Sequence, residues 1–459
     1  MKKVYLIFLN FFALNLYGQQ ILKEKVEIHK QKALRFLENS QIKTTIENKT
    51  FAGEWPAYMH MTNAYVLLGK SERYRDSNCF NMTGIFNALA ETYMQDTTQV
   101  QIKKMLKNAY PELLSYRKDS LFNFWKLLPP NRDLSRKTNN PDGLLVRRPT
   151  HYKLKTRFIN NAANVAFDND DTSMGNLSLY FYSKIFGENQ NQIVSYEAFD
   201  KYLDTNRKAY HWHNYLVRIP RENSAFLTWQ GKEREFKRWS FFKAAMHNLV
   251  FYLPASCANP RPFKPYIPWG ANDIDAVVNA NILTYLGTSG QLTNSKGRKG
   301  AEGLISYQIN RGRWSRAGMY YPNKYHFHYA VSRSMLVGKD QIIANGQAIL
   351  AHLLNTQFPD GHFESRRRVN KRDILQSTVY GLMSLLNFKE LGYDVPKERI
   401  DLTMSYLLKH QNEDGSWNGG VFFSGGTVVR NVLHFKSEAY TTALMVLAMN
   451  KWVHFGSAQ

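Results

Sequence analysis

Three carboxylates crowd into four consecutive positions of the sequence, at Asp168, Asp170 and Asp171, and Thr172 and Ser173 follow them directly. Acids followed by hydroxyl residues are typical of a helix N-terminus, where free N–H groups and the helix dipole favour negative charge. If these acids are withdrawn from water, they cannot all ionise cheaply, so the pKa of at least one should rise. A carboxylic acid that stays protonated is a Brønsted acid. The spacing alone also fits an exposed acidic cap or a calcium-binding loop.

A second acidic helix start contains Asp273 and Asp275 and leads into an apolar run over residues 276–285. Asp275 and Asn279 are four positions apart and share one face of the predicted helix, with Asn281 about half a turn away from that line. Polar side chains in an otherwise apolar helix either line a wet cavity or satisfy a network in the core, and the sequence leaves both interpretations open. We take Asp273, Asp275 and Asn279 as candidate substrate-binding residues.

An aromatic and histidine-rich region lies between the two acidic segments and continues after the second one. Aromatic faces stabilise cationic species and stack on sugars, but their commonest place is a plain hydrophobic core. Trp212 and Trp269 are the two aromatic side chains that we expect to contact a substrate. The members of this region are His211, Trp212, His213, Trp229, Trp239, Phe241, Phe242, Trp269, Tyr320, Tyr321, His326, Phe327, His328 and Tyr329.

A repeated turn runs through the C-terminal half of the chain. Its pattern is Gln, three residues, Gly, one residue and an aromatic side chain, and it occurs at Gln308–Trp314, Gln357–Phe363 and Gln411–Trp417. The glutamines are 49 and 54 residues apart. A helix that ends near the Gln, followed by a Gly that permits a tight turn, brings the aromatic side chain back onto the neighbouring unit. Hairpins of this kind, repeated, build a ring or solenoid of paired helices.

A looser copy of the same turn lies near the start of the chain. There Gln41 follows an apolar helical stretch, and Gly53-Glu-Trp55 comes after an insertion. We therefore expect one all-α domain over residues 19–459. It would consist of an N-terminal elaboration over about residues 19–150 and the repeat region over about residues 151–459.

The acidic cluster and the repeated turns are found together in a known family. Residues 168–173, Asp-Asn-Asp-Asp-Thr-Ser, resemble the DxDDTA motif of class II terpene cyclases, the group of squalene–hopene cyclase and copalyl diphosphate synthase. The three repeated turns resemble the Q-x-x-x-G-x-W turns of the same superfamily, and the match covers roughly residues 160–459. The resemblance implies an α/α toroid, which is a barrel of repeated helical hairpins.

The family's chemistry implies a role for each of the clustered acids. Asp170, the middle acid, would protonate an alkene or epoxide, while Asp168 and Asp171 would tune and orient it. Aromatic faces would hold the resulting carbocation in a dry cavity while rings close, and the protonation step itself needs no metal. The implied activity is an acid-initiated, intramolecular cyclisation of a polyprenyl or other membrane-derived lipid. Ser173 stands where the family's motif usually has Ala.

Metal-dependent ionisation of a diphosphate is not indicated by the sequence. A DDxxD motif beginning at Asp170 would need an acid where Met174 stands, and an NDxxSxxxE motif beginning at Asn169 would need Glu where Leu177 stands. The chain also contains no CxxC or HExxH pattern. We therefore expect no metal and no cofactor.

The composition bounds the class of protein and its partners. The chain has 459 residues, of which 44% are hydrophobic, and 60 Lys+Arg against 37 Asp+Glu. These values exclude a disordered chain and a small disulfide scaffold. The formal net charge of +23 calls for an anionic partner, for which we expect a peripheral anionic membrane surface or an acidic glycan. No nucleic-acid-reading module is present, so we expect no nucleic acid.

The N-terminus reads as a secretory signal peptide over residues 1–18. Lys2 and Lys3 precede an apolar segment that is too short for a comfortable membrane span. An uncleaved N-terminal anchor is the alternative. We therefore expect an exported protein, periplasmic or associated with the envelope. In such a compartment Cys79 and Cys257 either pair or remain two buried thiols.

Two further functions remain open at this stage. An exported carbohydrate-active enzyme, a glycoside hydrolase or lyase, would use two carboxylates across a groove, with Asp170 and Asp275 as candidates. A non-catalytic toroid that binds an envelope lipid, glycan or protein would leave the three clustered acids exposed or as a helix cap. An open groove with carboxylates roughly 6–9 Å apart favours the carbohydrate enzyme, whereas a closed apolar chamber favours the cyclase.

Overall fold

The structure is a computed structural model, and its described residues are 22–61, 73–129, 145–151, 164–188, 193–207, 223–231, 267, 272–338, 343–367, 370–425 and 433–456. The expected signal peptide, Trp212, Trp269 and Cys257 lie outside these residues. Within them, no helix is both long enough and apolar enough to cross a membrane. The described part of the chain is mostly helical, which confirms the expected all-α class.

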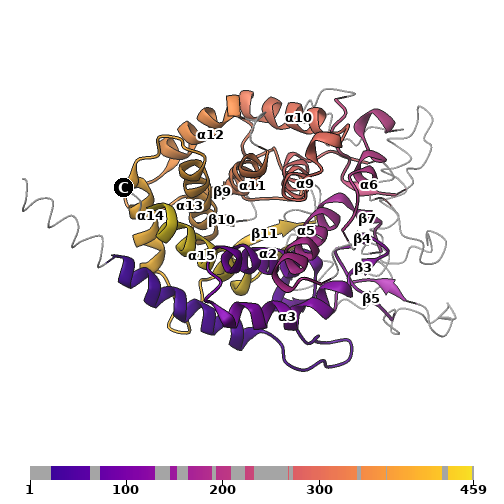
Figure 1. Ribbon diagram of the computed structural model, residues 1–459, viewed down its shortest axis with the longest axis horizontal. Helices are drawn as coiled ribbons and strands as arrows, with labels where there is room; N and C mark the ends of the chain where they lie inside the picture. The colour runs from indigo at the N-terminus through magenta and orange to yellow at the C-terminus, as the bar shows by residue number, and fades with distance from the viewer. Residues whose placement is uncertain are drawn as a thin grey trace, which may run out of the picture.

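Six of the described helices form a closed inner ring (Figure 1). Each contacts the next in chain order, and the last packs against the first. Their side chains are buried on nearly all faces, as expected for helices in the middle of a protein. The inner helices are α2 (Cys79–Gln95), α5 (Asn169–Phe186), α9 (Ala276–Thr288), α11 (Lys324–Val337), α13 (Leu375–Glu390) and α15 (Glu438–Lys451).

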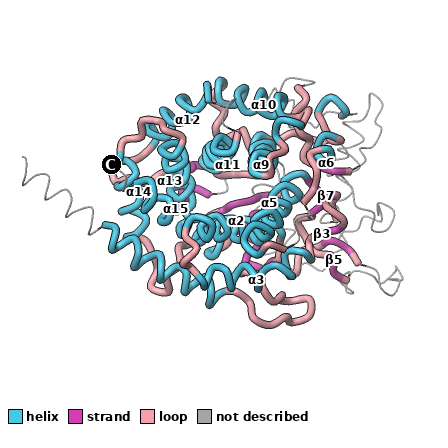
Figure 2. The backbone as a smooth tube through the Cα atoms, viewed as in Figure 1, coloured by secondary structure: helices cyan, strands magenta, loops and turns pink. Residues whose placement is uncertain are grey.

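A second layer of helices surrounds this ring (Figure 2). These outer helices are amphipathic: α14, for example, buries Ile400, Met404, Leu407 and Leu408 at helical spacing and exposes its other face. Together the two layers form an α/α toroid, so the architecture implied by the family resemblance is confirmed. The outer layer consists of residues 22–40, α3 (Val100–Leu114), the short α6 (Glu197–Asp200), α10 (Arg298–Asn310), α12 (Ile343–Thr356) and α14 (Lys397–Lys409).

The first described helices are members of the toroid itself. The helix over residues 22–40 belongs to the outer layer, while α2 contacts both α5 and α15 within the inner ring. Residues before position 150 therefore form part of the toroid. The division of the domain at that residue remains a sequence-based expectation.

Two of the repeated turns join neighbouring outer helices through their glutamines. The Nε2 group of Gln357 donates to Thr403 Oγ1 at 2.6 Å and to the carbonyl oxygen of Arg399 at 2.8 Å, both on α14. Gln411 donates from Nε2 to the carbonyl oxygen of His29 at 3.0 Å, which connects the last repeat to the helix over residues 22–40. The same contact that links consecutive repeats therefore also closes the ring.

The looser copy of the turn near the start of the chain has the same structure. Gln41 Nε2 donates to the carbonyl oxygen of Met105 on α3 at 3.0 Å. The indole N–H groups of Trp55 and Trp417 donate to the carbonyl oxygens of Leu37 and Leu407, at 2.9 and 2.7 Å, in equivalent positions. The insertion between Gln41 and Trp55 thus leaves the turn intact.

All six inner helices begin at the same end of the ring. Side chains near their starts meet: Asn323 Nδ2 donates to Ser377 Oγ at 2.9 Å, and Thr441 Oγ1 donates to Gln376. Five of the six have a polar side chain at the N-cap that accepts a backbone N–H. These N-caps are Asn78, Asp168, Asp275, Asn323 and Ser437.

The described strands lie in the segments that lead into the inner helices. An antiparallel sheet has the order β11–β12–β1–β2, and Met59 on β1 pairs with Phe435 on β12. In Figure 2 the strand β11 crosses the centre of the ring. The sheet consists of β11 (Val421–Ser424), β12 (Leu433–Lys436), β1 (Ala57–Met61) and β2 (Arg73–Asp76). The two-stranded pairs are β3 (Arg117–Lys118) with β4 (Leu121–Phe122), β5 (Leu127–Leu128) with β6 (Val146–Arg147), β7 (Phe167–Asp168) with β8 (Trp229–Gln230), and β9 (Ser365–Arg367) with β10 (Asn370–Asp373).

Candidate functional site

The acidic cluster forms the N-terminus of the inner helix α5, as the sequence predicts. Asp168 is the N-cap, and its Oδ1 accepts the backbone N–H of Asp171 at 2.7 Å. Asp170 and Asp171 occupy the first turn. All three side chains are buried, which contradicts an exposed acidic cap. No three His, Cys, Asp or Glu side chains in the described part of the chain are grouped to hold a metal ion.

Asp170 is held by two side chains from other inner elements. Asn281 on α9 donates from Nδ2 to Oδ1 of Asp170 at 2.8 Å, and the hydroxyl of Tyr321, just before α11, hydrogen-bonds Oδ2. Burial raises the pKa of Asp170 well above its usual value, and the charges of Asp168 and Asp275 raise it further, whereas the Asn281 hydrogen bond opposes the rise. The rise favours the protonated form of Asp170, and the contacts with Asn281 and Tyr321 fix the orientation of both carboxyl oxygens.

The two flanking acids lie against each other. The carboxyl groups of Asp168 and Asp171 are in side-chain contact. Burial raises the pKa of both groups, to about 6 for Asp168, where the Asp171 N–H and the positive charge of Arg147 work against the rise. The pKa of Asp171 rises further because of burial and the charges of Asp168 and Asp170. Burial therefore disfavours ionisation of both acids.

Aromatic rings surround the Asp170–Tyr321 contact. Tyr321 packs edge-on against His326, with ring centroids 4.5 Å apart, and lies 5.8 Å from Phe80 on α2. Phe80 in turn stacks on Phe422 at 5.5 Å and contacts Tyr440 on α15 at 6.0 Å. These rings come from three inner helices, from β11 and from the segment before α11, so Asp170 lies beside an aromatic cluster.

The aromatic wall continues along the inner helices towards their C-termini. His326 stacks on Tyr380 of α13 with centroids 4.5 Å apart, and Tyr380 stacks on Tyr329 of α11 at 5.7 Å. Burial lowers the pKa of His326 to about 3, so its ring is uncharged. The interior next to Asp170 is therefore lined by neutral π systems, which attract positive charge.

In the second acidic segment, Asp275 is the N-cap of α9 and also binds the backbone of the segment before α11. Oδ1 of Asp275 accepts the backbone N–H of Val277 at 2.7 Å, and its Oδ2 accepts those of Met319 and Tyr320. The Asn279 amide makes two hydrogen bonds to the backbone of Phe226, at 2.9 and 3.0 Å. These contacts commit both side chains to holding neighbouring segments in place.

Asp273 connects the second acidic segment to the aromatic region. Its Oδ2 accepts the hydroxyl of Tyr320 at 2.8 Å, and the same hydroxyl accepts the indole N–H of Trp229 at 3.1 Å. The binding of a substrate by Asp273, Asp275 and Asn279 remains a prediction, as does the contribution of Trp212 and Trp269, which lie outside the described residues.

Asn281 and Tyr321 are the site residues that the sequence-based selection missed. Asn281 stands out in the sequence as a polar residue in an apolar helix, but its separation of 111 residues from Asp170 hides the contact. Tyr321 belongs to the aromatic region, where nothing distinguishes it from Tyr320. No sequence pattern marks the other aromatic residues of the site, because they come together only when the ring closes. They are Phe80, Phe422, Tyr380 and Tyr440.

No protein-family model and no curated protein matches the sequence. Among solved structures, the type II terpene cyclase MstE from Scytonema, in complex with the substrate geranylgeranyl dihydroxybenzoate, matches with a TM-score of 0.53 at 12% identity, over 95% of this chain and 99% of that one. MstE in complex with its product merosterolic acid A matches with a TM-score of 0.54 at 11% identity, over 95% and 99% of the two chains. A protein from Actinoplanes matches with a TM-score of 0.50 at 11% identity, over 93% and 99%.

The fold is that of a terpene cyclase-like toroid. The resemblance seen in the motifs is therefore confirmed at the level of architecture. Identities of 11–12% establish the fold alone. The match spans nearly the whole of both chains, so the likeness in fold extends around the whole described ring.

Proposed function

We propose that this toroid is an acid-initiated isomerase that cyclises a polyprenyl or other membrane-derived lipid. The observation that carries the proposal is the setting of Asp170, a buried carboxyl group held by Asn281 and Tyr321 beside a cluster of aromatic rings. Burial in this setting raises its pKa and favours the acid form. Its position at the middle of the acidic cluster is the one that protonates in the cyclases that the motif resembles.

The first step transfers the Asp170 proton to a carbon of a substrate double bond. The π electrons form the new C–H bond, and the adjacent carbon becomes a carbocation while Asp170 becomes a carboxylate. Hydrogen bonds from Asn281 and Tyr321 stabilise that carboxylate, so they favour proton release. General acid catalysis of this kind contributes about 10²–10⁴-fold to a rate.

Ring closure then uses a second double bond of the same molecule as the nucleophile. Each closure consumes one π bond and moves the cationic carbon along the chain, past the faces of Phe80, Tyr329, Tyr380 and Tyr440. Loss of a proton ends the sequence, so the product has the same mass as the substrate. Aromatic faces stabilise the intermediate cation while offering it no nucleophile.

The substrate class that we propose is an isoprenoid or prenylated lipid. Two of the structural neighbours support this choice, because MstE was solved with geranylgeranyl dihydroxybenzoate and with merosterolic acid A. We further propose that the protein is exported and meets its lipid at an anionic envelope surface, where a formal charge of +23 favours binding. The arrangement of Asp275 gives no support to a glycosidase pair, because backbone N–H groups occupy both of its oxygens.

The proposal is tested by incubating the purified protein with an envelope lipid extract and searching by mass spectrometry for rearranged products of unchanged mass. Asp170→Asn is the control: we expect product formation to fall by about 10²-fold or more. Thermal stability should be equal or higher, since the amide replaces a group that is already uncharged. Full turnover by Asp170→Asn would overturn the proposed role of this acid.

A further inference from the structure

The inner helices α2 and α11 are not adjacent in the ring, but a pair of side chains connects them across its middle. In the ring, α2 lies between α15 and α5, whereas α11 lies between α9 and α13. These two helices are therefore on opposite sides of the interior. Any side-chain contact between them must cross the space that the proposed substrate would occupy.

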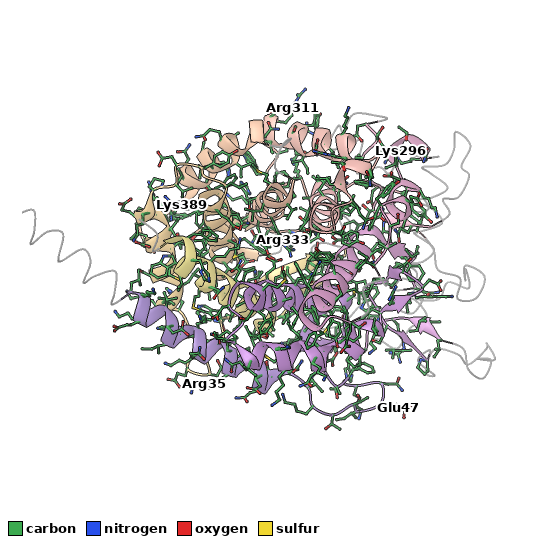
Figure 3. The ribbon with its side chains drawn as sticks, viewed as in Figure 1. Arg35, Glu47, Lys296, Arg311, Arg333 and Lys389 are labelled. Carbon is green, nitrogen blue, oxygen red and sulfur yellow. The ribbon has the colours of Figure 1, made fainter. Side chains whose placement is uncertain are left out.

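Arg333 on α11 and Glu91 on α2 make such a contact as an ion pair. The Arg333 Nη1 group also lies 3.8 Å from the sulfur of Met174 on α5. The two side chains are 9% and 20% exposed. Figure 3 shows Arg333 near the centre of the ring, whereas Arg35, Lys296, Arg311 and Lys389 lie at its periphery. We call this pair the interior ion pair.

The interior ion pair lies deeper in the ring than the acidic cluster. At 1.5 Å per residue, Arg333 is about 10 Å further along α11 than His326, and Glu91 is about 16 Å further along α2 than Phe80. Met174, which the guanidinium contacts, is about 6 Å below Asp170 on α5. Between these two levels the described side chains that cross or face the interior are the rings of Tyr329, Tyr380 and Tyr440.

A buried ion pair is a weak source of stability. Removing two charges from water costs several kcal/mol per ion, and well-packed apolar replacements are often neutral or stabilising. Displacing such a pair is unfavourable for an isoprenoid chain, because both charges would lose their partner while they remain away from water. The pair therefore acts as a polar boundary to an otherwise aromatic interior.

We propose that the interior ion pair of Arg333 and Glu91 is the floor of the substrate chamber and limits the length of isoprenoid chain that the protein accepts. This inference rests on the proposed function and goes beyond it by naming the residues that set chain-length specificity. The floor lies only about 6–16 Å further along the inner helices than the acid, so shorter isoprenoid chains fit between Asp170 and the ion pair. Longer chains meet the charged pair.

The test measures binding of farnesol, geranylgeraniol and hexaprenol to the full chain, by quenching of intrinsic fluorescence. The variant is the double substitution Glu91→Leu with Arg333→Met, which removes both charges at once and leaves no unpaired ion. The matched control is Glu390→Leu with Lys451→Met, because that ion pair, half of it buried, joins the neighbouring helices α13 and α15. Wild-type protein should bind hexaprenol about tenfold more weakly than geranylgeraniol.

We expect the Glu91/Arg333 double variant to lose most of this discrimination, by about fivefold or more, and the control variant to keep it. An unchanged chain-length profile in a Glu91/Arg333 variant that melts like the wild type would overturn the inference alone. An equal loss in the control variant would also overturn it, because a general loosening of the ring would then be the cause. Failure of wild-type protein to bind any of the three alcohols would overturn the proposed function as well.

Discussion

The amide nitrogen of Asn281 lies 2.8 Å from Oδ1 of Asp170, although 111 residues separate them in the chain. The contact joins α9 to the first turn of α5, two adjacent members of the inner ring. It fixes one oxygen of the acid and stabilises its ionised form. The strength of the acid therefore depends in part on a helix other than its own.

Replacing Asn281 with Ala should slow turnover without unfolding the protein. A hydrogen bond to a charged group is worth about 1.5–3 kcal/mol, so loss of the donor should reduce kcat by about 10- to 100-fold. Asn279→Ala on the same helix is the comparison, because Asn279 braces the backbone of Phe226 and makes no contact with Asp170. Steady-state kinetics should separate the two: reduced kcat for Asn281→Ala, and mainly a lower Tm for Asn279→Ala.

Tyr321→Phe should reduce activity while keeping the packing of the ring. The phenyl group preserves the contacts with His326, Phe80 and Phe423 and removes only the hydroxyl that binds Asp170. We expect a fall in kcat with KM nearly unchanged, because the lost hydrogen bond matters most when the acid has given up its proton. A variant with wild-type kcat would show that Tyr321 has no part in positioning the acid.

The buried carboxyl of Asp76 should make stability depend on pH in a defined direction. Burial raises its pKa to about 7, although it accepts hydrogen bonds from Thr150, Trp125 and Asn78. Because the folded state holds the proton more tightly than the unfolded chain, its contribution is fully present below pH 4 and is lost as the pH rises to about 7. Wild-type protein should therefore lose free energy of unfolding relative to Asp76→Asn across this range.

Denaturant titrations of both proteins at pH 4, 5, 6, 7 and 8 measure this difference. Asp119→Asn, at an exposed position, is a suitable reference and should parallel the wild type throughout. If the Asp76→Asn and wild-type curves run parallel as well, the buried carboxyl does not titrate in the folded state as described.

Gly415 and Gly392 allow two reasons for a glycine in a turn to be separated: a positive φ angle and a close approach of another segment. Their φ angles are +90° and +86°, so a side chain is strained at either position. A Cβ at Gly415 would lie 2.4 Å from the carbonyl oxygen of Lys32, whereas a Cβ at Gly392 would have nothing within 4 Å. We expect Gly392→Ala to cost about 1–2 kcal/mol and Gly415→Ala to cost clearly more. If denaturant titrations show equal losses in free energy of unfolding for the two variants, the backbone at Lys32 moves away from the new Cβ at little cost.

The sequence predicts the repeated architecture well because each repeat carries its own local signal. The Gln–Gly–aromatic turns identify the hairpins, and Gln41 and Trp55 show that even the copy with an insertion keeps the same hydrogen bonds. The helix start at Asp168 is equally readable, since N-cap preferences act within one turn. These features depend on residues that are close in the chain.

The composition of the site is less predictable, because it depends on where the ring closes. Asn281 reaches Asp170, and Arg333 reaches Glu91 across 242 residues, only once six inner helices are in place. Asp275 shows the opposite difficulty: an Asp at a helix start has the same appearance whether it caps the helix or binds a ligand. Its hydrogen bonds to Val277 and Met319 are visible only in the structure.

The hydrogen bond from Gln411 to His29 also distinguishes this protein from repeat proteins that are open at both ends. An open solenoid can gain or lose an internal repeat, because its terminal units carry polar capping faces. Here the last turn binds the first described helix as an earlier turn binds its neighbour. Adding or deleting one hairpin would change the circumference and leave that junction unmade, so the number of units in the ring is fixed by its closure.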